Sequence, residues 1–182
     1  EGARGRRVQC TELVSRARAA CPAQDLYIIA DEVMTGFGRT GSLFACEQAG
    51  ITPDLLCLAK GLTGGMYPLS VTMATEALYQ VFWSEERTRA LFHGHTFTGN
   101  PVGCAVALAS LAITKERDVP AQLSAIGLRI AEGLGHLEQE PHVSDLRQLG
   151  GMVAFDLAAD DAGYLSQRGP ALRKVAQDNG VL

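Results

Sequence analysis

The chain has 182 residues, of which 47% are hydrophobic and 20% charged, and its formal net charge is -4, a composition typical of a globular protein with one core or part of a larger domain. Its densest positive cluster is three arginines within the first seven residues, so we expect no nucleic-acid partner. Every apolar run is interrupted before the roughly 20 residues that a membrane-spanning helix needs, so we expect no membrane role.

The five cysteines show no C-x-x-C pair and mostly lie in apolar or helical stretches. This pattern indicates reduced thiols in the cytoplasm rather than a disulfide framework or a zinc site. The chain begins with Glu1 and ends at Leu182, where a further strand is expected to begin, so we interpret the 182 residues as part of a longer chain.

The first half of the chain alternates predicted helices and strands. Apolar spacing predicts a helix over 8–21, and a short helix is expected over 42–51. Strands are predicted over 26–30, 53–60 and 68–75. The first strand is uniformly apolar, which is typical of a central strand in a parallel sheet covered on both faces.

The second half is helical before a final α+β segment. Asn100 is placed to cap a helix that has Pro101 in its first turn. A second helix is predicted over about 122–140, followed by two strands that meet at Gly150 and Gly151.

An amphipathic helix over 171–180 follows and ends in a glycine. The whole pattern predicts an α/β fold with a domain boundary within the helices, so that 1–120 and 121–182 belong to different domains.

Two opposite charges follow neighbouring predicted strands. Asp31 ends the first apolar run and Lys60 ends the second, and ligands of open α/β sheets bind beyond the carboxyl ends of the strands. Lys60 is one of three lysines, and its apolar setting suits an amine that forms Schiff bases; a structural lysine paired with a carboxylate is the alternative. Strand alternation places Val33 on the same face as Asp31. A carboxylate beside a valine suits a flat, protonated ring such as that of pyridoxal phosphate.

The stretch "IIADEVMTGFGRTG", a gap of twelve residues and "DLLCLAKGLTGG" together resemble the class III aminotransferase signature around its cofactor lysine. The likeness continues through "LFHGHTFTGNPVGCAVALASL" to "LRQLGGMVAFDL". It implies fold type I of the pyridoxal-phosphate-dependent transferases and a homodimer with shared active sites. Residues 1–120 would form part of the large, mostly parallel-sheet domain, and 121–182 a linking helix with part of the C-terminal α+β domain.

The resemblance also assigns roles to the residues around the cofactor. It implies that Lys60 is the catalytic residue that holds pyridoxal phosphate and contacts substrate, that Asp31 partners the pyridine nitrogen, and that Val33 lies against the ring. His95 and Thr96 match a phosphate-binding pair donated across the dimer interface. Without the resemblance, a polar loop residue is the favoured interpretation of Thr96.

Two further residues are expected at the substrate. By the resemblance Gly94 borders the substrate and Arg39 lines the mouth of the site, with a surface salt bridge as the alternative for Arg39. His93 and His95 have no third ligand in the sequence, so no metal is expected.

Met34 separates this chain from many family members that act on ornithine, acetylornithine or 4-aminobutyrate, which have glutamine at this position. The resemblance therefore favours S-adenosylmethionine and 8-amino-7-oxononanoate, the substrates of an aminotransfer step in biotin biosynthesis. Transfer from ω-amino acids to pyruvate, or another class III reaction, is the alternative.

Two other classes of protein compete with an aminotransferase. A strand ending in Asp-Glu also occurs in P-loop ATPases, but the sequence has no G-x-x-x-x-G-K-[ST] stretch. A non-catalytic binding domain on the same sheet is the other alternative. The family's glycine and serine phosphate loop, its ring-stacking aromatic residue and its substrate-carboxylate arginine are not found in these residues, so we expect the 182 residues alone to be inactive.

Overall fold

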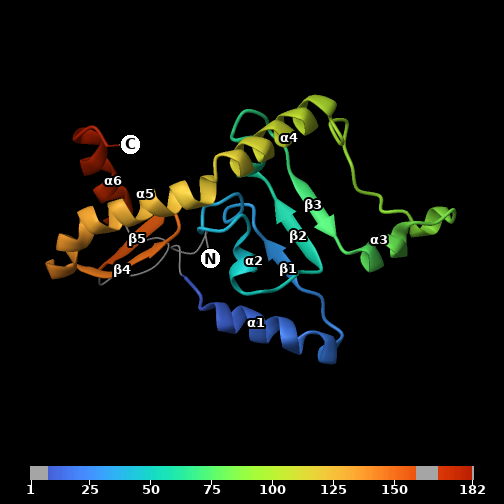
Figure 1. The fold of residues 1–182 in the computed structure, drawn as a ribbon, viewed down its shortest axis with the longest axis horizontal. Coiled ribbons are helices and arrows are strands. Elements are labelled where there is room, and N and C mark those ends of the chain that lie inside the picture. Colours follow the sequence, from blue (N-terminus) through green and yellow to red (C-terminus); the bar gives the residue numbers. More distant parts are fainter. Residues whose placement is uncertain (1–7, 159–167, 182) are drawn as a thin grey trace.

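The computed structural model describes residues 8–158 and 168–181. A three-stranded sheet lies between the N-terminal helix and a long pair of helices, and a separate β-hairpin lies beside the second of these (Figure 1). The elements in chain order are α1 (Thr11–Ala20), η1 (Pro22–Gln24), β1 (Ile29–Asp31), α2 (Ala45–Gln48), β2 (Leu55–Leu58), η2 (Lys60–Thr63), β3 (Val71–Ala74), α3 (Glu76–Phe82), η3 (Arg87–Arg89), α4 (Pro101–Glu116), α5 (Val119–Leu134), η4 (Gly135–Gln139), β4 (Val143–Leu149), β5 (Met152–Leu157) and α6 (Arg168–Asp178).

The three-stranded sheet is mixed. β1 and β2 pair in parallel, with Asp31 opposite Cys57, which confirms the parallel pairing of the first two predicted strands. β3 runs antiparallel to β2, with Val71 opposite Leu58. Residues 59–70 contain only the short helix η2, so no crossover helix returns the chain to run parallel to β2.

Within the described residues β1 has one neighbouring strand, β2, and the prediction that the first strand is covered on both faces stays a prediction. Ile29 is 62% exposed, and Leu26 and Tyr27 before it are also exposed. The buried apolar residues are Phe37, Leu58 and Leu62. They lie under the loop that follows β1 and under η2, the short helix that begins at Lys60 and is called the lysine turn below.

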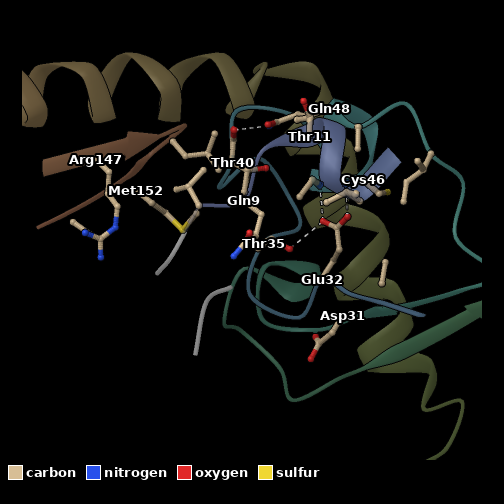
Figure 2. A pocket seen from close by; sticks show the side chains of 18 residues that line it. Gln9, Thr11, Asp31, Glu32, Thr35, Thr40, Cys46, Gln48, Arg147 and Met152 are labelled. Atoms are coloured by element: carbon tan, nitrogen blue, oxygen red, sulfur yellow. Dashed lines mark hydrogen bonds between the residues drawn. The ribbon is translucent and has the colours of Figure 1, made fainter. Parts of the chain in front are cut away.

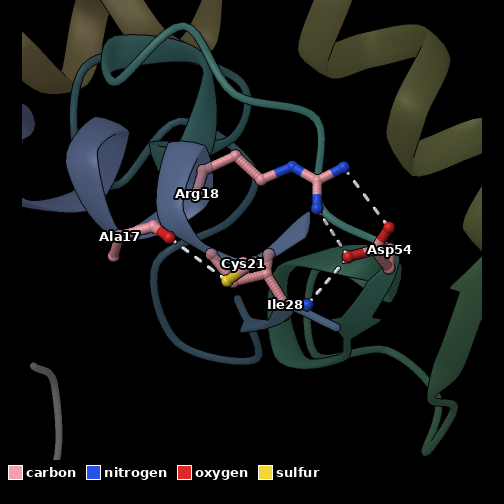
Figure 3. A network of polar contacts seen from close by, with 5 residues as sticks. All are labelled: Ala17, Arg18, Cys21, Ile28 and Asp54. Carbon is pink, nitrogen blue, oxygen red and sulfur yellow. Dashed lines mark hydrogen bonds and ion pairs between the residues drawn. The ribbon is translucent and has the colours of Figure 1, made fainter. Parts of the chain in front are cut away.

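Asp54 fixes the start of the strand pair and joins it to α1. Its carboxylate binds Arg18 in two places, at 2.7 and 3.3 Å, and accepts a hydrogen bond of 2.8 Å from the backbone N–H of Ile28 (Figure 3). The backbone N–H of Asp54 in turn donates to the carbonyl of Ile28 at 3.0 Å. This network explains why regular strand pairing begins at Ile29 rather than at the predicted residue 26.

α4 and α5 position two different parts of the chain. Asn100 caps α4 as predicted, because its side chain accepts a hydrogen bond of 3.0 Å from the N–H of Gly103. α4 packs on η2, where Ser110 Oγ donates to the carbonyl of Gly61 at 3.3 Å. α5 packs on the β4–β5 hairpin (Figure 1).

The backbone bends between the two helices at Asp118, which has a left-handed φ of 47°. The predicted domain boundary at residue 120 lies beside this bend and stays a prediction. Within residues 8–158 and 168–181, no helix has both the length and the apolarity to cross a membrane.

Candidate active site

The carboxyl ends of β1 and β2 bring the acidic and basic candidates to one edge of the sheet. Asp31 is the last residue of β1, and its register partner Cys57 lies three residues before Lys60. Because the two strands run in parallel, both side chains leave the sheet at the same edge. This arrangement is the one expected from the sequence.

The carboxylate of Asp31 is exposed and faces away from that of Glu32, its neighbour in the chain (Figure 2). Asp31 Oδ1 accepts a hydrogen bond of 3.1 Å from the backbone N–H of Val33. β1 ends at Asp31, so strand alternation does not extend to Val33, and the contact between the two residues is the hydrogen bond of a local turn. The place of the Val33 side chain beside the cofactor stays a prediction. The outer oxygen lone pairs of Asp31 stay available to a ligand.

Lys60 opens the short helix η2 with a left-handed φ of 50°, and its side chain is exposed. It lines an open groove of about 1140 Å³ together with Gly94 and His95, two of the other predicted site residues. The groove also contains Tyr67, which the sequence interpretation missed. Gly103 of α4 leaves room for this ring, since a Cβ there would lie 3.1 Å from Tyr67 Cδ1.

The segment that carries the predicted phosphate-binding pair is an exposed loop before α4. His95 donates its backbone N–H to Thr98 Oγ1 at 2.9 Å, and its Nδ1 lies 3.1 Å from the N–H of Phe97. Thr96 is exposed, and its hydroxyl has no hydrogen-bond partner among the described residues. A Cβ on Gly94 would meet only Thr98 Oγ1, at 3.6 Å, so nothing in the described part of the chain forces glycine at this position.

Arg39 lies apart from the groove. Its carbonyl accepts a hydrogen bond of 3.0 Å from the N–H of Gly151, in the turn of the β4–β5 hairpin. Its side chain makes no ion pair with any residue that the structure describes, so neither the predicted place at the mouth of the site nor the alternative surface salt bridge is seen. The role of Arg39 stays a prediction.

Glu32 is the main residue of this region that the sequence interpretation left without a role. It is only 3% exposed, and its carboxylate is directed at the start of α2 (Figure 2). The pKa of the nearby Cys46 thiol is raised to about 12, chiefly by burial and then by the hydrogen bond and negative charge of Glu32. The sequence contains no local signal for the burial of Glu32, because its partners are N–H groups 13 and 14 residues later in the chain.

The parallel strand pair, the acid at its end and the lysine turn beside an open groove are the features of an α/β fold that binds a ligand at its strand ends. The comparisons place this fold among the fold-type-I pyridoxal-phosphate-dependent transferases. The chain belongs to the class-III aminotransferase family, whose model matches residues 1–182.

Individual relatives agree with this assignment. The chain is 46% identical over 184 residues to the adenosylmethionine-8-amino-7-oxononanoate aminotransferase of Synechococcus elongatus, and the match covers 100% of this chain and 42% of the relative. The solved structure of the enzyme of that name from Methanocaldococcus jannaschii matches with a TM-score of 0.81 and 35% identity over 92% of this chain and 41% of that one. A PLP-bound amine transaminase from an uncultivated Pseudomonas species matches with a TM-score of 0.85 and 33% identity over 96% and 41%. The chain therefore spans about two-fifths of the length of these relatives.

Proposed function

We propose that the protein is a pyridoxal-phosphate-dependent aminotransferase in which Lys60 holds the cofactor. The observation that carries the proposal is the parallel register of β1 and β2, which sets Asp31 and the Lys60 turn at the same sheet edge. The residues fit the cofactor, because Lys60 is exposed to an open groove and Asp31 has oxygen lone pairs free beyond its single bond to Val33. Pyridoxal phosphate supplies an electron sink for the substrate's α-carbon.

The side chains of this protein supply attachment, orientation and proton transfer. Lys60 Nζ would attach the cofactor and would then move the proton of the donor's α-carbon. Asp31 would hold the proton of the pyridine nitrogen through a charge-assisted hydrogen bond, and Val33 would lie against the ring. Gly94 would border the substrate in the groove of Lys60, whereas Arg39 lies apart from that groove, so its contact with substrate is proposed from the family resemblance alone.

His95 and Thr96 reach the phosphate of the opposite subunit in a cytoplasmic homodimer. The segment around them supports this role, because its large apolar residues are open to solvent: Trp83, Leu91, Phe92 and Phe97 are each more than 60% exposed. An exposed apolar stretch of this kind is typical of a protein interface.

The proposed substrates are S-adenosylmethionine as amino donor and 8-amino-7-oxononanoate as acceptor. Two observations support them. Relatives such as the one from Synechococcus elongatus, 46% identical, are adenosylmethionine-8-amino-7-oxononanoate aminotransferases, and Met34 has a thioether that cannot donate the hydrogen bond of the glutamine found in several other members. An ω-amino-acid:pyruvate aminotransferase is the second candidate, supported by the likeness to an ω-transaminase from Thermomicrobium roseum at 33% identity.

The donor distinguishes the two candidates. The complete encoded protein, loaded with pyridoxal phosphate, is mixed with S-adenosylmethionine and, separately, with alanine or β-alanine, and the visible cofactor band is followed. We expect the band to be lost with S-adenosylmethionine and to persist with alanine or β-alanine. Loss of the band with the simple amino acids and none with S-adenosylmethionine would overturn the substrate proposal and leave the aminotransferase proposal intact.

A further inference from the structure

The carboxylate of Glu32 is buried among backbone donors. Its oxygens accept hydrogen bonds from the N–H groups of Ala45 at 2.6 Å and Cys46 at 2.7 Å, and from Thr35 Oγ1 at 3.2 Å. No salt bridge to Glu32 occurs within the described ranges, so these donors, together with the Cys46 thiol, hold the buried carboxylate (Figure 2). A buried carboxylate with such partners resists displacement, because losing them leaves it unsatisfied.

These bonds close the loop that follows β1. Glu32 joins the end of the strand to the first residues of α2, and the loop of residues 33–44 lies between them. Inside the loop, the N–H of Gly36 donates to the carbonyl of Glu32 at 3.0 Å, and the N–H of Phe37 donates to that of Leu43 at 2.7 Å. The loop is therefore tied at its base by Glu32 and across its middle by its own backbone.

Phe37, in the closed loop, packs against the lysine turn. Phe37 is 7% exposed and packs with Leu58 and Leu62, which lie on either side of Lys60 in the chain. The contact with the turn is tight, since a Cβ on Gly61 would lie 2.8 Å from Phe37 Cβ. Lys60 itself has a left-handed φ, a conformation that a non-glycine residue keeps only when its surroundings hold it.

We infer that Glu32 is a positioning residue for both ends of the cofactor site, acting directly on the neighbouring Asp31 and, through the loop and Phe37, on the Lys60 turn. The inference rests on the proposed function for the roles of Asp31 and Lys60. A purely structural carboxylate would affect stability alone. A positioning carboxylate also sets how the folded protein holds pyridoxal phosphate.

The test uses the complete encoded protein with four substitutions. Glu32→Gln replaces one acceptor oxygen by an amide that faces backbone N–H donors, Thr35→Val removes only the 3.2 Å bond, and Gly61→Ala pushes on Phe37 from the other side. Glu47→Gln is the matched control, because that carboxylate is exposed and accepts a single bond, from the N–H of Phe44 at 3.1 Å.

Two readouts are taken for folded protein: the affinity of the cofactor-free protein for pyridoxal phosphate, and the pH midpoint of the visible band of the lysine-bound cofactor. Glu32→Gln is expected to weaken affinity roughly tenfold or more, the order expected for losing a hydrogen bond to a charged group, and to shift the midpoint. Gly61→Ala is expected to change both readouts in the same direction, because its methyl group displaces Phe37 from the turn at Lys60. Thr35→Val is expected to show a smaller change in the same direction, and Glu47→Gln none.

An unchanged affinity and midpoint in both Thr35→Val and Gly61→Ala would overturn the inference, even if Glu32→Gln failed to fold. A wild-type protein that shows no lysine-bound band would overturn the proposed function instead, so the two failures are distinguishable.

Discussion

Replacing Gly127 by alanine tests the contact between α5 and the β4–β5 hairpin. A Cβ at Gly127 would lie 1.9 Å from the carbonyl oxygen of Gly150, and a Cβ at Gly150 would lie 2.3 Å from the N–H nitrogen of Gly41. Gly150 is thus held between α5 and the loop after β1, with backbone on both sides. To reach ordinary van der Waals contact, α5 and the hairpin must separate by about 1.5 Å. Such a shift also breaks the 3.0 Å bond from the Gly151 N–H to the Arg39 carbonyl.

The expected cost follows from these contacts. Overpacking costs about 1–3 kcal/mol and the lost hydrogen bond about 1 kcal/mol, while alanine in a helix gains about 1 kcal/mol over glycine. Gly127→Ala should therefore lower the free energy of unfolding by about 1–3 kcal/mol. Gly133→Ala, in the same helix with nothing within 4 Å of its Cβ, should cause no loss. Thermal and urea unfolding of the complete protein measures both variants, and equal stability of the two would refute the reasoning.

Two further predictions concern Cys46 and Asn100. Because the pKa of Cys46 is raised to about 12, iodoacetamide should modify the exposed Cys10 and Cys104 first; peptide mapping checks this order, and early labelling of Cys46 at pH 9 would contradict it. The free energy of unfolding should also fall as the pH rises above 9, where the thiol ionises in the unfolded chain but not in the folded one, and unfolding measured against pH checks this. Asn100→Ala removes the acceptor of the Gly103 N–H and should cost about 1 kcal/mol in urea unfolding, whereas an unchanged midpoint would show that the cap does not contribute.

Local signals predicted much of the fold. The capping residue Asn100 and the glycine pair at 150–151 each act through neighbours in the chain, and both elements formed where the sequence placed them. Asp31 and Lys60 were predicted at one sheet edge because the ends of parallel strands depend only on strand order.

Features that depend on distant partners could not be predicted in the same way. The start of β1 depends on Asp54, 26 residues after Ile28, and the buried state of Glu32 depends on N–H groups 13 and 14 residues later. The direction of β3 depends on the absence of a crossover helix between it and β2. The spacing of apolar residues along the sequence predicts none of these contacts.

The most direct test of the account is the identity of the lysine that holds the cofactor. The complete protein is loaded with pyridoxal phosphate, reduced with borohydride, digested, and the labelled peptide is identified by mass spectrometry. The account predicts a label on Lys60 and none on the other two lysines of the sequence, Lys115 and Lys174. A label on either of those with none on Lys60 would contradict it.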